Sequence, residues 1–108
     1  MKEAFAKGLY ETVIEDGCAI YADLFAHTVP DKRTTPYWRE ALAFYHSLNE
    51  GQKAVFHSIL KQVMTDTVSG VLGILDGSSG DFDCTVTING ESSGEELQAL
   101  FLEYAETV

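Results

Sequence analysis

Long stretches of this chain place apolar residues three or four positions apart, and this spacing restricts the fold to a mainly helical one. Over residues 2–27 one such stripe comprises Phe5, Leu9, Val13, Ile20 and Leu24. A second stripe comprises Tyr10, Ile14, Cys18, Tyr21 and Phe25. Because the two stripes together widen the apolar surface, we expect this first helix to be buried on more than one side. Gly17 in its middle predicts a kink or a close helix crossing.

A second helix is expected after Pro30. The residue before a proline is disfavoured in the α region, so the first helix should end near His27. Thr35 and Pro36 are typical of an N-cap and a first helical residue. The apolar face of this helix is expected to comprise Trp38, Ala41, Leu42, Tyr45 and Leu48. Its aromatic content also suits a homodimer interface.

A third helix is predicted over residues 50–75. Asn49 and Gln52 resemble a capping box at its start, and Asp76-Gly77 ends it. We expect one buried side, with Thr67 at its centre. That side comprises Phe56, Ile59, Leu60, Val63, Val71 and Ile74. The last turns also contain small residues, which allow another backbone to approach.

One β element separates the third and fourth helices. Over residues 82–88, apolar and polar side chains alternate, and Asn89-Gly90 is a strong turn signal. A lone strand leaves backbone groups without partners, and three arrangements would satisfy them. We favour a small hairpin packed on helices. The alternatives are an extended segment against the third helix and pairing with the same strand of a second chain.

A fourth helix is predicted to follow a capping box at Ser93-Gly94-Glu95-Glu96. Its apolar face comprises Leu97, Leu100, Phe101 and Tyr104. The expected fold is therefore mainly α, with about four helices around one core and a short β-strand or hairpin between the third and fourth. With 108 residues, of which 45% are hydrophobic, the chain suits a single small helical domain over residues 1–108.

The start of the chain has charges where a secretory signal would be apolar, as at Lys2, Glu3 and Lys7. The longest apolar stretch, 67–75, is much shorter than the ~20 residues that span a bilayer. We therefore expect a cytoplasmic protein. Cys18 and Cys84 are expected to be reduced thiols there, with a disulfide between them as the alternative.

The negative charge of this chain is concentrated in its second half. Residues 1–61 carry all seven lysines and arginines together with eight acids, whereas residues 62–108 carry nine acids and no base. The net charge is −10, which disfavours binding to nucleic acid and to anionic membranes. The acidic half serves either solubility or recognition of a cationic partner, whose association it would accelerate and orient.

The sequence contains no catalytic motif, so we expect no enzyme and no cofactor. No two of its histidines are three or four positions apart, although Asp23 and His27 could meet on one helix. A calcium loop beginning at Asp76 would need glycine at its sixth position and glutamate at its twelfth. Those positions hold Asp81 and Thr87, so the match fails.

The leading hypothesis is a small acidic interaction protein that binds a basic protein partner, such as an inhibitor or immunity-type protein that neutralises a cationic toxin. The expected contact residues are Asp81, Asp83, Glu91, Glu95, Glu96, Glu103 and Glu106. One alternative is a structural homodimer without a heterologous partner. A weaker alternative is a cation-binding or small-molecule-binding domain.

Overall fold

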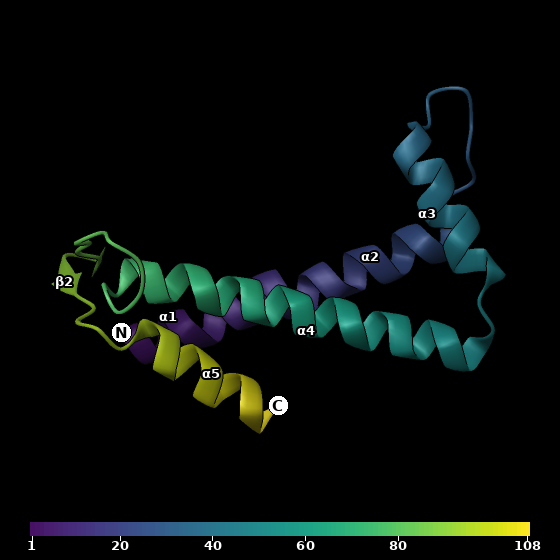
Figure 1. Ribbon diagram of the computed structural model, residues 1–108. Helices are drawn as coiled ribbons and strands as arrows, with labels where there is room; N and C mark the ends of the chain where they lie inside the picture. Colours follow the sequence, from purple (N-terminus) through teal and green to yellow (C-terminus); the bar gives the residue numbers. More distant parts are fainter.

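The computed structural model describes all 108 residues, and it is mainly α-helical (Figure 1). The first helical run comprises α1 (Lys2–Leu9), the π-helical segment η1 (Tyr10–Glu15) and α2 (Asp16–His27). The elements after it are α3 (Pro36–Ser47), α4 (Glu50–Leu75), β1 (Thr87–Ile88), β2 (Glu91–Ser92) and α5 (Leu97–Thr107). The predicted fold class, with four helices and a short hairpin between the last two, is confirmed.

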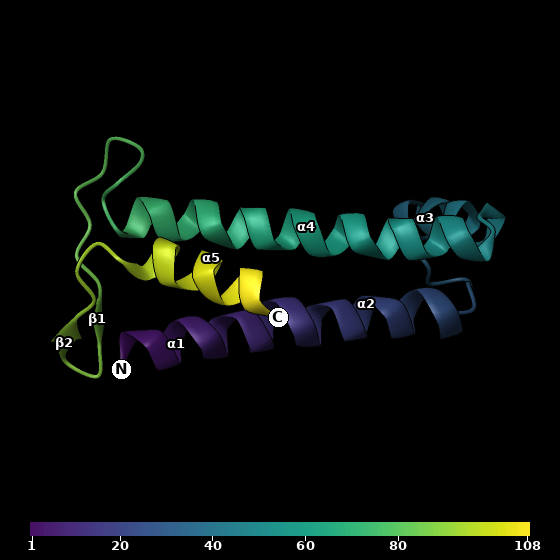
Figure 2. The ribbon, with the colours of Figure 1, turned by 90° about the horizontal axis from the view of Figure 1, so that it is seen from below.

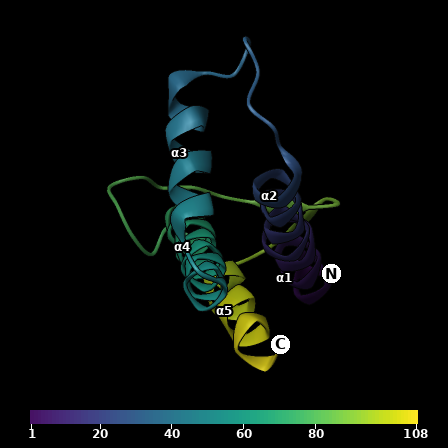
Figure 3. The same cartoon turned by 90° about the vertical axis from the view of Figure 1, so that its right-hand side faces the viewer.

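The two long helical runs lie side by side and antiparallel (Figure 2). α5 packs against α1 and α4 near the hairpin, while α3 stands away from the bundle at the opposite end (Figure 3). The molecule measures 47 × 29 × 24 Å, with a radius of gyration of 17.3 Å. A compact domain of this length would have a radius of gyration of about 13 Å. The elongated shape therefore leaves much of each helix near solvent.

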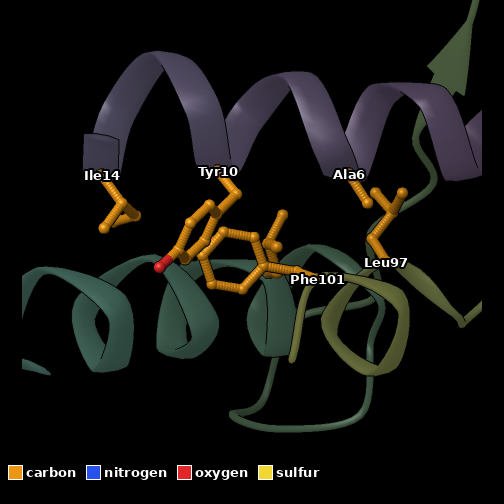
Figure 4. Close-up of a cluster of buried hydrophobic side chains, with 6 residues drawn as sticks. Ala6, Tyr10, Ile14, Leu97 and Phe101 are labelled. Atoms are coloured by element: carbon orange, nitrogen blue, oxygen red, sulfur yellow. The ribbon is translucent and has the colours of Figure 1, made fainter. Parts of the chain in front are cut away.

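Two clusters of buried apolar side chains hold the helices together. The cluster at the hairpin end comprises Ala6, Tyr10, Ile14, Leu72, Leu97 and Phe101 (Figure 4). The cluster at the α3 end comprises Phe25, Leu42 and Tyr45. α4 contributes to both, because Phe56 and Leu60 pack against the second cluster, and Met64 and Val68 against the first.

The π-helical segment η1 keeps one face of the first run directed at the core. Ala6, Tyr10 and Ile14 are all buried and lie four residues apart. In an α-helix, residues four apart drift by about 40° around the axis, since a turn holds 3.6 residues. The wider π turn holds more residues and reverses part of that drift. The kink predicted at Gly17 is wrong, because the irregular segment lies at 10–15. The alternative, a close helix crossing, fits the structure, since a Cβ at Gly17 would be 2.6 Å from the Met64 methyl group of α4.

The prediction that the first helix is buried on more than one side is wrong. Phe5, Val13 and Ile20 of the first stripe are exposed, and so is Tyr21 of the second. The other members of the second stripe are buried or half-buried. α4, α5 and, at Phe25, α3 pack against the buried side of this run, and no further layer covers the opposite side.

α4 carries two parallel apolar rows, of which its own chain covers one. The buried row comprises Phe56, Leu60, Met64, Val68 and Leu72, all buried or half-buried. The exposed ridge comprises Val55, Ile59, Val63, Thr67, Val71 and Leu75. The predicted buried side mixed these rows, and it is wrong for Ile59, Val63, Thr67, Val71 and Ile74, which are exposed. The reason is that α5 packs against Thr65, Ser69 and Gly73 instead, a polar and small-residue row.

Local capping residues set the ends of α3 and α4 as expected. The Trp38 N–H donates to the Thr35 hydroxyl at 3.4 Å. At the start of α4, the Gln52 N–H donates to the Asn49 side chain at 2.8 Å, and the Asn49 N–H donates back to Gln52 at 2.9 Å. α4 ends before Gly77, which has a φ of +75° that favours glycine.

The β element is shorter than predicted. β1 and β2 pair antiparallel within the chain, with Thr87 opposite Ser92 and Ile88 opposite Glu91, so the favoured hairpin is present. Residues 82–86 are not part of the ladder, and Phe82 is largely exposed. The alternation nevertheless holds from Asp83 onward, because Cys84, Val86 and Ile88 are half-buried between exposed neighbours.

Candidate partner-binding surface

All seven acids predicted to contact a partner have exposed side chains. They lie in the α4–β1 loop, on β2, just before α5 and on α5: Asp81, Asp83, Glu91, Glu95, Glu96, Glu103 and Glu106. The first five belong to the segment between α4 and α5, which covers one end of the molecule (Figure 2). We call this end, residues 77–96, the acidic end.

Asp83 and Glu95 of the acidic end border the same pocket as the buried Asp76 at the end of α4. Both line one pocket beside the hairpin, together with Cys84, Val86 and Ser92. Glu91 lies in a separate hollow that it shares with residues 1–3 at the N-terminus. Three carboxylates from different parts of the segment therefore border the hairpin.

The two acids on α5 lie on opposite flanks of that helix. Glu103 lines the groove between α1 and α5, where Glu3 and Lys7 also lie. Glu106 lines the groove between α4 and α5, where Lys61 and Asp66 lie. Each of these two acids therefore has a lysine of the first half of the chain nearby, unlike Asp83 and Glu95.

Glu96 forms a salt bridge with Lys2, which links the start of α5 to the start of α1. The hydrogen bond that Lys2 donates to the Glu96 carboxylate, together with the negative charge of that group, holds the pKa of Lys2 above its ordinary value of 10.5. Glu3 lies next to Lys2 in the sequence. Its carboxylate accepts a hydrogen bond from the Glu3 backbone N–H and lies near the N-terminal ammonium, and both hold the pKa of Glu3 below its ordinary value of 4.5. Among the seven predicted acids, Glu96 is the member paired with a base.

Asp76 has a structural role that the sequence analysis missed. Its side chain is buried, and its carboxylate accepts hydrogen bonds from the backbone N–H groups of Leu97 at 3.2 Å and Gln98 at 2.8 Å. These groups belong to the first turn of α5, where backbone donors have no partner within the helix and the helix dipole favours an anion. The end of α4 therefore caps the start of α5.

The predicted capping box at 93–96 is wrong. Glu96 occupies the N-cap position, and no side chain of its own segment caps α5. Ser93 is buried before the helix, and its N–H donates to the Val86 carbonyl at 2.9 Å to close the hairpin. Asp76, from the end of α4, already accepts the hydrogen bonds of the first turn of α5. Residues 93–96 are therefore not needed as a cap and form the turn at Gly94.

The α4–α5 contact next to Asp76 is polar and close. The Gln98 side-chain amide donates to the carbonyl of Ser69 at 3.0 Å and to its hydroxyl at 3.2 Å. Gly73 lies beneath this amide, and a Cβ at that position would be 3.0 Å from the Gln98 nitrogen. This contact positions α5, and with it the acidic end, relative to the rest of the molecule.

The other groups considered in the sequence lie apart from one another. His27 Nδ1 is 2.9 Å from Asp23 Oδ1 on the exposed side of α2, as the spacing predicts. Cys18 and Cys84 are both free and half-buried, so the disulfide alternative is wrong. No three histidine, cysteine or acidic side chains are grouped so that they could hold a metal ion.

None of the helices combines the length and the apolar composition that a membrane span requires. No protein-family model, curated protein or solved structure matches this chain.

Proposed function

We propose that this chain is a protein-binding protein whose acidic end takes a basic surface of another protein. The observation that carries the proposal is the excess of exposed negative charge at that end. Asp81, Asp83 and Glu95 form no salt bridge, whereas Glu96 pairs with Lys2, and Glu91 shares its hollow with Lys2 and the N-terminus. Residues 77–96 contain five exposed carboxylates and no base, and Lys2 is the cation that pairs with one of them. Like charges crowded in this way repel one another, and a cationic partner relieves the repulsion.

The hairpin gives this charge a defined geometry. Asp83 and Glu95 approach the same pocket from opposite ends of the hairpin segment, and the hairpin is anchored because Val86 and Ile88 pack against the hairpin-end cluster. α5 begins at a fixed place because Asp76 caps it. An anchored acidic surface orients a basic partner, whereas a floppy acidic tail would only attract it.

We propose an inhibitor or immunity-type role as the specific form of this binding. The acidic end would cover the cationic surface with which a toxin or nuclease engages its own anionic target. The electrostatic term would act chiefly on the association rate, which would then fall steeply as the salt concentration rises.

The experiment is a charge reversal with a matched control. The test variant is Asp83→Lys/Glu95→Lys at the pocket, and the control is Glu11→Lys/Glu15→Lys on the exposed side of the first helical run. Both change the net charge by the same amount. The wild-type chain is immobilised, partners are captured from the native host's lysate at low salt, and association rates are measured with the purified partner.

We expect the test variant to bind about tenfold or more slowly and with a weaker salt dependence, since steering changes association rates by 10–10³. The control should bind nearly as fast as the wild type. Equal slowing in both variants would mean that only net charge matters, and binding that ignores both salt and the test variant would overturn the proposal.

A further inference from the structure

Tyr10 is a buried side chain whose polar end has no partner in the chain. Its ring packs against Phe101 and Tyr104, with centroids 5.8 Å and 5.5 Å away, and the residue is 1% exposed. A buried tyrosine hydroxyl usually finds a hydrogen-bond partner, as that of Tyr45 does in His57. The Tyr10 hydroxyl forms no hydrogen bond within the chain. Since no enclosed polar side-chain atom of the protein lacks a partner, this hydroxyl must be open to the cavity that Tyr10 lines.

The cavity lies between α4 and α5, with η1 beneath them. Its buried members, Tyr10 and Thr65, form the floor, and exposed side chains of α4 and α5 form the rim. The Tyr10 oxygen lies at the end of the ring away from η1 and points toward α4 (Figure 4). The volume is about 380 Å³, within the range of roughly 300–1,000 Å³ for small-molecule sites. The cavity therefore combines an unpartnered polar group with room for a small ligand.

Two opposite charges border this cavity from different helices. Lys61 lies on α4 and Glu106 on α5, and neither belongs to any of the salt bridges of the protein. The other carboxylate of the rim, that of Asp66, accepts a hydrogen bond from the Gln62 amide at 2.9 Å. The groups left without a partner are therefore one ammonium, one carboxylate and the phenol of Tyr10.

The chemistry of these groups selects a ligand that carries both charges. An anion alone would meet Glu106, and a cation alone would meet Lys61, so either would leave one charge of the rim unmatched. A zwitterion pairs with both, through charge-assisted hydrogen bonds. Leu102 and Ala105 of α5 are half-buried in the same wall and offer contact to an apolar side chain.

We propose that this cavity binds a free amino acid with an apolar side chain. The ligand carboxylate accepts hydrogen bonds from the Lys61 ammonium and the Tyr10 hydroxyl, and the ligand ammonium donates to the Glu106 carboxylate. The side chain packs against Leu102 and Ala105. The Thr65 hydroxyl, which donates to the Lys61 carbonyl at 2.8 Å, holds the floor of the cavity together and is not required to bind the ligand.

The first test varies the charges of the ligand. L-leucine, L-valine and L-methionine are titrated into the full chain by NMR, and the tightest binder is compared with its amide and with its deaminated acid. Each analogue keeps the side chain and loses one charge. We expect both analogues to bind about tenfold or more weakly, as is typical for the loss of a hydrogen bond to a charged group. Binding by none of the three amino acids, or equal binding of either analogue, would overturn the proposal.

The second test varies the protein, with a matched control for each change. Tyr10→Phe, Lys61→Gln and Glu106→Gln should each weaken binding of the same amino acid about tenfold. Tyr104→Phe and Glu103→Gln make the same chemical changes at residues that do not line this cavity, and should leave binding unchanged. Wild-type affinity in the three cavity variants, or an equal loss in the controls, would show that the ligand binds elsewhere and would overturn the proposal.

Thermal unfolding of the free protein separates binding from a structural role. Because the Tyr10 hydroxyl has no partner to lose, Tyr10→Phe should unfold at the wild-type temperature without ligand and lose part of the upward shift that the amino acid causes in the wild type. If Tyr10→Phe is itself destabilised, Lys61→Gln and Glu106→Gln, whose side chains are exposed, decide under the same criteria.

This inference and the proposed function fail separately. The cavity shares no residue with the acidic end, residues 77–96. Asp83→Lys/Glu95→Lys should therefore leave binding of the amino acid unchanged, and Tyr10→Phe should leave the salt-dependent association of the acidic end in place.

Discussion

At the hairpin end of α4, Tyr10 and Phe101 are fully buried with their ring centroids 5.8 Å apart, and the Asp76 carboxylate binds α5 directly. At the α3 end, the contacts are between aromatic rings. The ring centroid of Phe25 lies 4.8 Å from that of Tyr45 and 5.2 Å from that of Phe56. Several of the surrounding rings are partly exposed. One half-buried hydrogen bond, between the Tyr45 hydroxyl and His57 Nε2 at 2.9 Å, also joins α3 to α4. The same long helix is therefore held at one end by burial and a cap, and at the other by ring packing near solvent.

This difference indicates that the two ends differ in local stability. Segments with few fully buried side chains open at lower free energy than the rest of a protein. We expect α3 to detach while α1, α4 and α5 remain packed. The acidic end, at the other extremity, would stay in place during such opening.

The largest expected effect on stability comes from removing one phenylalanine ring from each buried cluster, Phe101 at the hairpin end and Phe25 at the α3 end. Phe101→Ala should lower the free energy of unfolding by about 3–5 kcal/mol, as is usual for a buried phenylalanine. Phe25→Ala should lower it less, and should mainly remove the hydrogen-exchange protection of α3. Urea unfolding and hydrogen exchange measure both. Loss of protection throughout the chain in Phe25→Ala would show that the two ends unfold as one unit.

The second effect concerns the cap. Asp76→Ala should lower the free energy of unfolding by about 1–3 kcal/mol, because two backbone donors of α5 lose a charged acceptor. Asp81→Ala in the same loop, with an exposed side chain, should change it by less than about 0.5 kcal/mol. Thermal unfolding compares the two. Equal effects would mean that the loop charge, and not the cap, matters.

The smallest effect is that of the exposed pair Lys2–Glu96. Since the folded-state pKa of Lys2 is raised above 10.5, its contribution to stability is present below that pH and is lost as the pH rises through the folded value. Glu96→Gln should bring the pKa of Lys2 back toward 10.5, while Glu95→Gln should not. NMR titration of the Lys2 side chain measures this. An unchanged pKa in Glu96→Gln would contradict the salt bridge.

Much of the fold could be predicted because the information is local. The caps at Thr35 and Asn49 bind backbone groups three residues away, and Asp76-Gly77 ends α4 within the same turn. The cap of α5 could not be predicted, because its acceptor lies 21 residues before Leu97. The local pattern at Ser93 resembled a cap, but the hairpin uses that residue.

The exposure of the acids was easier to anticipate than their grouping. Charged side chains remain at the surface in nearly any fold. Which of them approach one another depends on tertiary contacts, so the sequence could not separate Asp83 and Glu95, which share a pocket, from Glu103 and Glu106 on opposite flanks of α5. Likewise, both apolar rows of α4 have helical spacing, and the placement of the first helical run, α3 and α5 decides which row is covered. The single domain and the cytoplasmic location stay predictions.

The Asp76 carboxylate, which joins the end of α4 to the start of α5, also fixes both ends of the segment that connects the two helices. The intervening chain leaves and returns at one anchored point. Its exposed tip, residues 80–82, lies beyond Ser78 and Ser79, whose N–H groups donate to the Gly73 carbonyl at the end of α4. Lengthening a loop whose ends are already joined costs little entropy. A fluorescent reporter or a purification module inserted at that tip should therefore leave the bundle intact, which makes this site preferable to the chain start, where Lys2 is engaged.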